Sequence, residues 1–181
     1  MISFTTAEEN LPSFDNPLEM LHACHEKILR QCDTLRKLAL HLTNNGCDQQ
    51  VRQAAQNILR YFDTAGQFHH QDEEEDLFPA LQISAEADKS HLENLLGLLL
   101  QEHNEMRGAW DALRPVLVQL SQGKQVSFAH SLLENFINKY TEHIAFEENE
   151  LLPLATRLLD SQQLLKIGKH MAERRGANVI N

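Results

Sequence analysis

The chain has 181 residues, enough for one domain with its own hydrophobic core. Its 7 glycines, 5 prolines and 6% aromatic residues are typical of helices rather than strands, so we expect an all-α fold. The formal net charge of −10 argues against a nucleic acid or an anionic membrane as the main partner, because both attract clustered lysine and arginine.

The first helix is predicted to begin at Asn16-Pro17. Asparagine is a common N-cap residue, and proline at the first helical position loses no hydrogen bond. Apolar residues then recur every three or four positions over 18–42, and the segment 43–46 (TNNG) predicts the helix end. Residues 1–15 show no sustained period, and we expect them to form an N-terminal arm.

The same apolar step predicts a second and a third long helix. The second stripe starts at Val51, and its helix is expected to end near Phe78-Pro79, since proline disfavours helix at the residue before it. A turn around 84–87 leads to the third stripe, over 92–120, where Pro115 predicts a kink.

A fourth long helix carries its apolar stripe over 133–158, with an interruption at Pro153. A shorter amphipathic helix is expected over about 161–174, where it caps the bundle or meets a second subunit in a homodimer. Four long helices with short connections predict an up-down-up-down antiparallel four-helix bundle over about 17–158, within a single domain of residues 1–181.

Each long helix interrupts its apolar stripe with side chains that bind metals. These are His25, His69, Glu73, His103, His143 and Glu147. Because an unpaired carboxylate in a packed interior costs several kcal/mol, the two glutamates require positive charge nearby. Each follows a histidine by four residues, which places both side chains on one helix face.

The four histidines are expected to lie in one layer of the bundle. Residues on antiparallel helices meet when they lie equally far from the connecting turn, and neighbouring histidines satisfy this condition to within about one helical turn, at roughly 1.5 Å per residue. The second and fourth helices also share a longer pattern. It reads His69, Glu73, Leu77, Phe78 and Pro79 in one, and His143, Glu147, Leu151, Leu152 and Pro153 in the other. This pseudo-repeat suggests two metals related by approximate symmetry.

Four imidazoles and two carboxylates suit iron, with manganese or zinc as alternatives, whereas calcium and magnesium prefer oxygen ligands. If both glutamates bridge two metals, the protein supplies about eight of about twelve coordination positions. We therefore expect two iron ions with a bridging oxide, hydroxide or water. The open positions suit dioxygen or nitric oxide.

The sequence resembles the hemerythrin-like (HHE cation-binding) family from about His25 to Pro153. The resemblance is carried by Cys24-His25-Glu26, by HHQDEEEDLFP from His69, by EHNEM from Glu102 and by HIAFEENELLP from His143. Carried over residue by residue, the family's ligands fall on the same six positions.

The chain departs from oxygen-carrying hemerythrins, which have a fifth histidine on the third helix. The positions one turn either side of His103 hold Leu99 and Arg107. The set of four histidines and two glutamates is more similar to the branch linked to nitrosative stress and to repair of iron–sulfur centres. The cysteine-bearing N-terminal segment of that branch is not found here.

The remaining histidines and acids are interpreted mainly as structural. His22 is expected at the bundle edge. The alternative interpretation is that it is an alternate ligand or a proton relay. Surface positions are expected for His41, His70, His91, His130 and His170, which lie off the apolar stripes. The acidic run 74–76 predicts a solvated helix face. Most of the four acids that flank the ligand positions are expected at the surface, with orientation of the imidazoles as the other reading: Glu26, Glu102, Glu105 and Glu148.

We expect a cytoplasmic protein without a membrane segment. The N-terminus has no basic region followed by an apolar run, and the most hydrophobic stretch, 95–100, is too short to span a bilayer. The three cysteines form no CxxC pair, which argues against a disulfide framework and a thiolate zinc site.

Three functions fit this pattern. The first is a module that binds or senses dioxygen or nitric oxide, or responds to redox or iron stress. The second is an enzyme acting on peroxide or dioxygen, for which we assign no catalytic residue; histidine-rich ligation favours binding, because oxygen-activating bundles of the ferritin type use mostly carboxylates. The third is a scaffold with structural zinc whose C-terminal helix recruits a partner.

Overall fold

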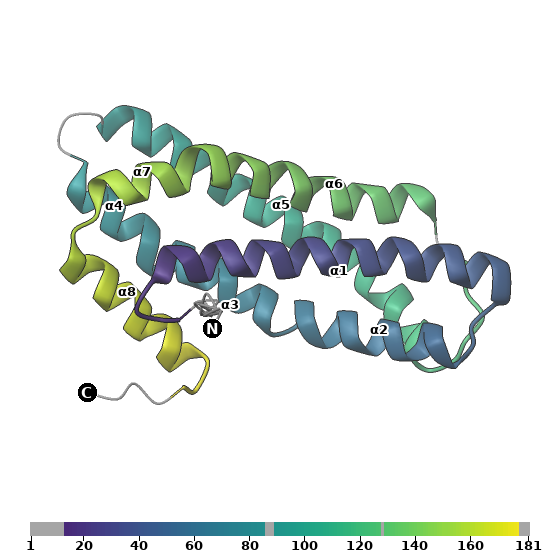
Figure 1. The fold of residues 1–181 in the computed structure, drawn as a ribbon. Helices are drawn as coiled ribbons and strands as arrows, with labels where there is room; N and C mark the ends of the chain where they lie inside the picture. Colours follow the sequence, from purple (N-terminus) through teal and green to yellow (C-terminus); the bar gives the residue numbers. More distant parts are fainter. Residues whose placement is uncertain (1–12, 86–88, 128, 178–181) are drawn as a thin grey trace, which may run out of the picture.

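The computed structural model describes residues 13–85, 89–127 and 129–177, and all regular structure in these ranges is helical. Four long rods run along one another, and a shorter helix packs against one end of them (Figure 1). The predicted all-α bundle with an extra C-terminal helix is therefore confirmed. The predicted N-terminal arm, 1–15, falls mostly outside the described residues, as does half of the predicted turn at 84–87.

The segments in chain order are α1 (Pro17–Asn45), α2 (Gln49–Phe62), α3 (Ala65–Gln71), the π-helix η1 (Asp72–Leu77), α4 (Phe78–Ser84), α5 (Lys89–Ser121), α6 (His130–Phe146), the π-helix η2 (Glu147–Leu151), α7 (Leu152–Leu158) and α8 (Ser161–Arg174). The stretch from α2 to α4 makes one rod, and the stretch from α6 to α7 makes another. With α1 and α5 they form the bundle. Among the helices of the described residues, none is long and apolar enough to cross a lipid bilayer.

The first helix follows the sequence prediction at both ends. The backbone carbonyl of Asn16 accepts a hydrogen bond from the Met20 N–H, and Pro17 occupies the first position. The Asn16 side chain bonds Glu19 instead of a backbone N–H. Gly46 has φ of 75°, which glycine adopts without strain, and its N–H bonds the carbonyl of Leu42 to close the last turn.

The second rod differs from its prediction at two points. It breaks at Asp63, whose carboxylate accepts hydrogen bonds from Trp110 and Arg114 of α5. It also continues past Pro79 to Ser84, although the sequence predicted an end near Phe78-Pro79. The wider π-helical turn of η1 ends two residues before Pro79. We attribute the continuation of the helix past Pro79 to the room that this turn gives the proline ring.

The fourth rod repeats this construction. Its interruption, predicted at Pro153, is the π-helix η2, which ends two residues before that proline. α5 passes through Pro115 as one helix of 33 residues. Thus both halves of the pseudo-repeat place a π-helix between the last histidine and the proline.

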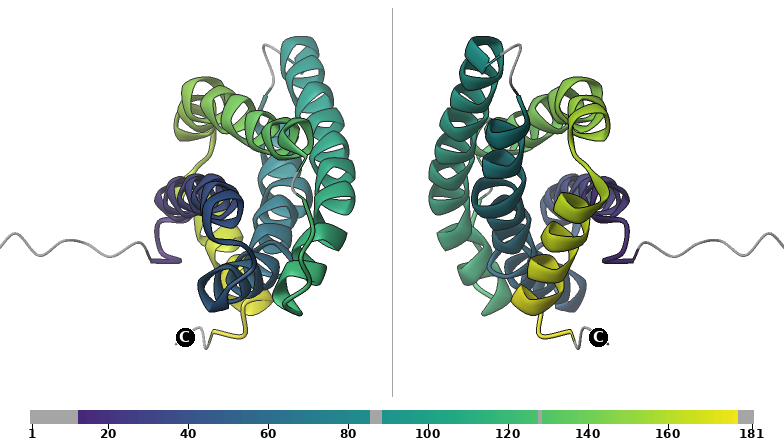
Figure 2. Two further views of the ribbon diagram at one scale, coloured as in Figure 1. Left: turned by 90° about the vertical axis from the view of Figure 1, so that its right-hand side faces the viewer. Right: turned by 90° about the vertical axis from the view of Figure 1, so that its left-hand side faces the viewer.

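Each rod packs against two neighbours, so that the bundle closes into a ring when viewed along its length (Figure 2). The interior holds two separate apolar clusters. One contains Ile28, Ile58, Phe62, Leu113 and Phe136 among others. The other contains Leu21, Leu81, Leu99, Leu151 and Met171 among others. The polar layer described below lies between them.

The C-terminal helix α8 begins with a capping box in which Asp160 and Gln163 exchange hydrogen bonds with each other's backbone N–H. It packs against α1 and η1 at the end of the bundle. Gly168 of α8 lies directly against the backbone of Phe14, and a Cβ added there would come within 1.8 Å of the Phe14 carbonyl oxygen.

We therefore expect Gly168→Ala to lower the free energy of unfolding by about 1–3 kcal/mol, because the backbone contact must open. Gly97→Ala is the matched control, since no atom lies within 4 Å of a Cβ built there. It should stabilise the protein by about 0.5–1 kcal/mol through helix propensity. Denaturant unfolding of both variants measures the difference, and equal stability of the two would contradict the close contact.

Candidate metal centre

The structure brings all six predicted ligand residues into one buried layer. They come from α1 (His25), α3 (His69), η1 (Glu73), α5 (His103), α6 (His143) and η2 (Glu147). Each side chain is at most 2% exposed. The layer falls into two overlapping groups, His25–His69–Glu73–Glu147 and Glu73–His103–His143–Glu147, in each of which the ligand atoms lie within 4.8 Å of one another. Both groups contain both glutamates.

The two oxygens of Glu73 face different histidines. Oε1 lies 3.5 Å from Nε2 of His69 and 3.9 Å from Nε2 of His25. Oε2 lies 3.4 Å from Nε2 of His103. One carboxylate therefore contributes an oxygen to each half of the layer.

Glu147 divides its oxygens in the same way. Its Oε2 lies 3.1 Å from Nε2 of His25, and its Oε1 lies 3.1 Å from Nε2 of His143. Oε1 of Glu147 is also 3.9 Å from Nε2 of His103. Both carboxylates thus lie across the boundary between a His25–His69 pair and a His103–His143 pair.

The π-helices set the position of both glutamates. Glu73 is the second residue of η1 and Glu147 the first of η2, and each carbonyl accepts a hydrogen bond from the N–H five residues on, of Phe78 and Leu152. Each glutamate is also four residues from a histidine, so each HxxxE motif runs from an α-helix into a wider turn. Single π-turns of this kind often occur at functional sites.

Buried polar atoms in this layer lack hydrogen bonds. Within the described residues, the atoms without a partner of suitable geometry are Nε2 of His25, both ring nitrogens of His69 and His70, and both oxygens of Glu73 and Glu147. Buried polar groups in proteins are normally satisfied, so this set fits a bound cation. Imidazole nitrogens and carboxylate oxygens are also the donors that transition metals accept.

The electrostatics of the layer also call for positive charge. Burial, together with the charge of Glu147, raises the pKa of Glu73 to about 7. Burial opposes the charged form of His25, but the carboxylates of Glu147 and Glu73 outweigh it and raise the His25 pKa to about 11. The same competition raises the pKa of His143 to about 9. Protons take up the negative charge where no metal does, and a divalent cation would replace them.

Three of the four histidines are oriented by a carboxylate behind the ring. Nδ1 of His103 lies 2.7 Å from Glu74, and Nδ1 of His143 lies 2.7 Å from Glu102. His25 makes the same contact with Glu148. With Nδ1–H donating to an acid, Nε2 presents its lone pair to the centre, which is the usual arrangement behind metal-bound imidazole.

Of the four flanking acids, two orient an imidazole in this way, Glu102 and Glu148. The other two are elsewhere, since Glu26 pairs with Arg30 and Glu105 with Lys139. His22 lies at the bundle edge as predicted and contacts Glu148 at 2.9 Å.

The predicted solvated face at 74–76 holds for Glu75, which is exposed, but not for Glu74 and Asp76, which are partly buried. Glu74 also pairs with Arg107, and its contacts with His103 and Arg107 lower its pKa to about 2. Arg174 of α8 contacts both Glu75 and Asp76. These partners could not be predicted from the sequence pattern because both arginines come from other helices.

Two further buried residues were missed. His70 was predicted on the surface, yet it is only 4% exposed. Consecutive residues of a helix point about 100° apart, and α3 lies inside the bundle over a wider arc than one stripe, so the residue after His69 is also covered. Asp72 is fully buried and bonds Arg174 and Arg175 of α8. The other four histidines predicted at the surface, His41, His91, His130 and His170, are exposed or half-buried.

Comparison with known proteins agrees with this geometry. A family model for the hemerythrin HHE cation binding domain matches residues 16–155. An uncharacterized protein of Haemophilus influenzae is 34% identical over 167 residues, which cover 92% of this chain and 94% of that protein. The chain belongs to the hemerythrin HHE cation-binding family. It is therefore a metal-binding, hemerythrin-like protein, and its His and Glu clusters are the candidate site.

We expect Glu102→Ala to weaken metal binding by about 10- to 100-fold, because His143 loses the acceptor that orients it. Glu105→Ala is the matched control one turn along the same helix, where the carboxylate contacts Lys139 instead of a histidine. Competition with a chelator for Co²⁺ measures both affinities. Equal affinities would show that the acid behind His143 has no part in metal binding.

Proposed function

We propose that this protein is a non-haem di-iron protein that binds dioxygen or nitric oxide as a sensing or binding module. The observation that carries the proposal is the division of the Glu73 and Glu147 oxygens between two pairs of histidines. A carboxylate that faces two donor groups in this way suits two metals that share it. A single ion would leave one pair of histidines without a metal.

The donor set supports iron, with manganese or zinc as the alternatives. In this proposal His25 and His69 would hold one ion and His103 and His143 the other, and both glutamates would be shared between the two ions. These six side chains do not fill two octahedral shells, and a bridging oxide, hydroxide or water would take some of the rest. A bound iron supplies the redox activity and the affinity for diatomic molecules. The chain's own residues would supply neutral imidazoles, shared carboxylate oxygens and apolar surroundings that exclude water.

The composition of the layer favours binding over oxygen activation. Histidines outnumber carboxylates among the six residues, and the motif is His-xxx-Glu, whereas ferritin-type enzymes use Glu-xx-His and mostly carboxylates. The apolar clusters on both sides of the layer exclude water, which suits the retention of a small neutral ligand.

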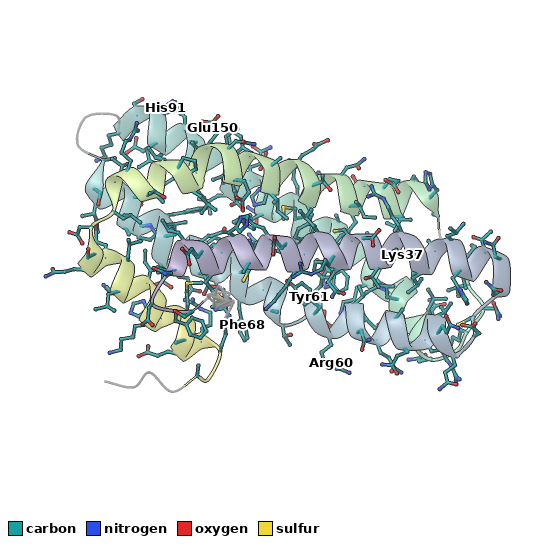
Figure 3. The ribbon with its side chains drawn as sticks, viewed as in Figure 1. Lys37, Arg60, Tyr61, Phe68, His91 and Glu150 are labelled. Atoms are coloured by element: carbon teal, nitrogen blue, oxygen red, sulfur yellow. The ribbon has the colours of Figure 1, made fainter. Side chains whose placement is uncertain are left out.

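Metal content tests the paired centre. Protein loaded anaerobically with Fe²⁺ should hold two irons per chain, and Glu147→Ala should hold one or fewer, because Glu147 belongs to both ligand groups. Glu150→Ala is the matched control, since Glu150 is in the same π-helix but exposed on the outside (Figure 3). One iron per wild-type chain, or unaltered content in Glu147→Ala, would refute the shared site.

Ligand binding tests the role. Addition of azide to the oxidised iron protein and of nitric oxide to the reduced protein should each change the visible absorption spectrum, because open positions accept these molecules. Unchanged spectra would rule out the binding function. Turnover of hydrogen peroxide that is lost in Glu73→Ala would instead favour an enzyme.

A further inference from the structure

His70 is a buried residue that the proposed centre does not use. Its side chain is 4% exposed, and neither ring nitrogen has a hydrogen-bond partner among the described residues. An unpaired polar group in a protein interior costs free energy, and here two nitrogens of one ring are in that state. A structural histidine in the core would normally donate to a backbone carbonyl or an acid.

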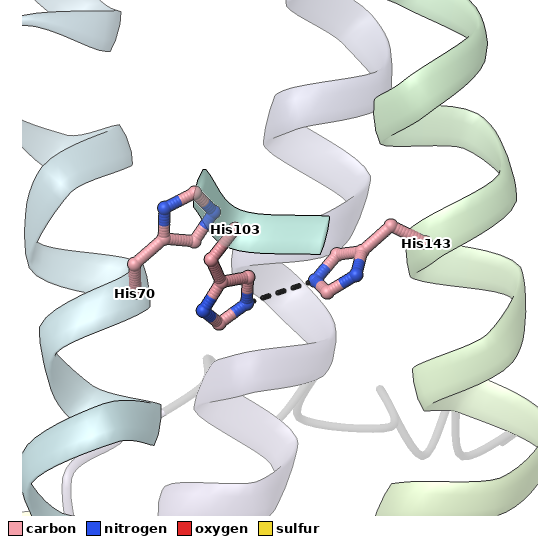
Figure 4. Close-up of side chains that lie close together, drawn as sticks. All are labelled: His70, His103 and His143. Atoms are coloured by element: carbon pink, nitrogen blue, oxygen red, sulfur yellow. Dashed lines mark hydrogen bonds between the residues drawn. The ribbon is translucent and has the colours of Figure 1, made fainter. Parts of the chain in front are cut away.

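The ring of His70 lies beside two histidines of the centre, as Figure 4 shows. One nitrogen of each of His70, His103 and His143 falls within 4.8 Å of the others. The His103 and His143 Nε2 atoms are themselves 3.0 Å apart. Two nitrogens bound to one metal at about 2.1 Å are separated by at most about 4.2 Å, so the three rings are close to the spacing that a shared ion needs.

Helix geometry explains how one helix can serve both metals. His69 and His70 are adjacent in α3, so their side chains point about 100° apart. His69 faces His25, at 4.8 Å between ring centroids. His70 instead stacks on His103, at 4.1 Å between centroids and 16° between ring planes. Because an imidazole binds a metal in the plane of its ring, the His70 ring must turn about its side-chain bonds from this parallel arrangement to share the metal of His103. The two neighbours therefore point to opposite halves of the layer.

We propose that His70 is a fifth imidazole ligand, which binds the metal held by His103 and His143. This inference rests on the proposed di-iron function. It makes the two metals unequal. The His103–His143 metal has five protein donors, with His70, Glu73 and Glu147 completing its set. The metal of His25 and His69 has four donors.

The alternative is that His70 is only an aromatic spacer between His103 and Tyr140, whose ring it also parallels at 6.1 Å. His70→Phe separates these roles, because phenylalanine keeps a flat ring and removes both nitrogens. The metal-free variant should fold at least as stably as wild type, since an unpaired polar group is replaced by an apolar one. His91→Phe is the control, because His91 is an exposed histidine near the start of α5, away from His103 (Figure 3).

Co²⁺ is the probe for this test, because it is paramagnetic and shifts the N–H signals of bound imidazoles out of the ordinary proton NMR range. Wild type and His91→Phe should bind two Co²⁺ per chain and show five shifted imidazole N–H signals. His70→Phe should show four signals, and its affinity for one of the two ions should fall at least about tenfold. Added imidazole should restore that affinity in His70→Ala, where space is left.

Four signals in wild type, or wild-type Co²⁺ affinities in His70→Phe, would overturn the assignment of His70 and leave the paired centre intact. Binding of a single Co²⁺ by wild type would overturn the di-metal function itself. The two failures are therefore distinguishable in one titration. Thermal unfolding of the metal-free variants shows that any loss of Co²⁺ affinity does not come from a damaged fold.

Discussion

Two carboxylates in an apolar interior are the constraint on which the rest of this structure depends. Glu73 and Glu147 are fully buried between two apolar clusters, where each ionised group costs several kcal/mol unless positive charge meets it. The bundle surrounds them with imidazoles from all four rods. It then places acids behind three of those imidazoles, namely Glu74, Glu102 and Glu148. The polar layer, its position between the two clusters and its metal affinity all follow from the need to neutralise these two side chains.

Charge alternates outward from this layer. Acids lie behind the imidazoles, and basic groups lie behind some of the acids, as Arg107 does for Glu74. On the side of η1, Asp72 is held by Arg174 and Arg175 of α8, while the next residue, Glu73, faces the centre. The C-terminal helix is therefore fastened one residue away from a candidate ligand. Membership of a cation-binding family agrees with a layer built this way.

The common layer of the six candidate ligands was predictable because a polar residue that interrupts an apolar stripe is visible in the sequence, and because distances from turns place such residues at one level. The four rods were predictable for the same reason. The break at Asp63 was not, since it depends on partners in α5. Glu74 and His70 were also missed. Both residues lie off the apolar stripe, as surface residues do. Side chains of α5 and α6 cover His70, and side chains of α5 pair with Glu74.

The π-helices have a consequence for how such sequences are read. His69, Glu73, Leu77 and Leu81 are all buried, and so are His143, Glu147, Leu151 and Ala155. In an ordinary α-helix a step of four residues drifts by about 40°, so three such steps would carry the last residue about 120° away from the first. The wider turn cancels this drift. A run of buried-type residues spaced by four, with a proline two positions after its third member, thus indicates an expanded helical turn from the sequence alone.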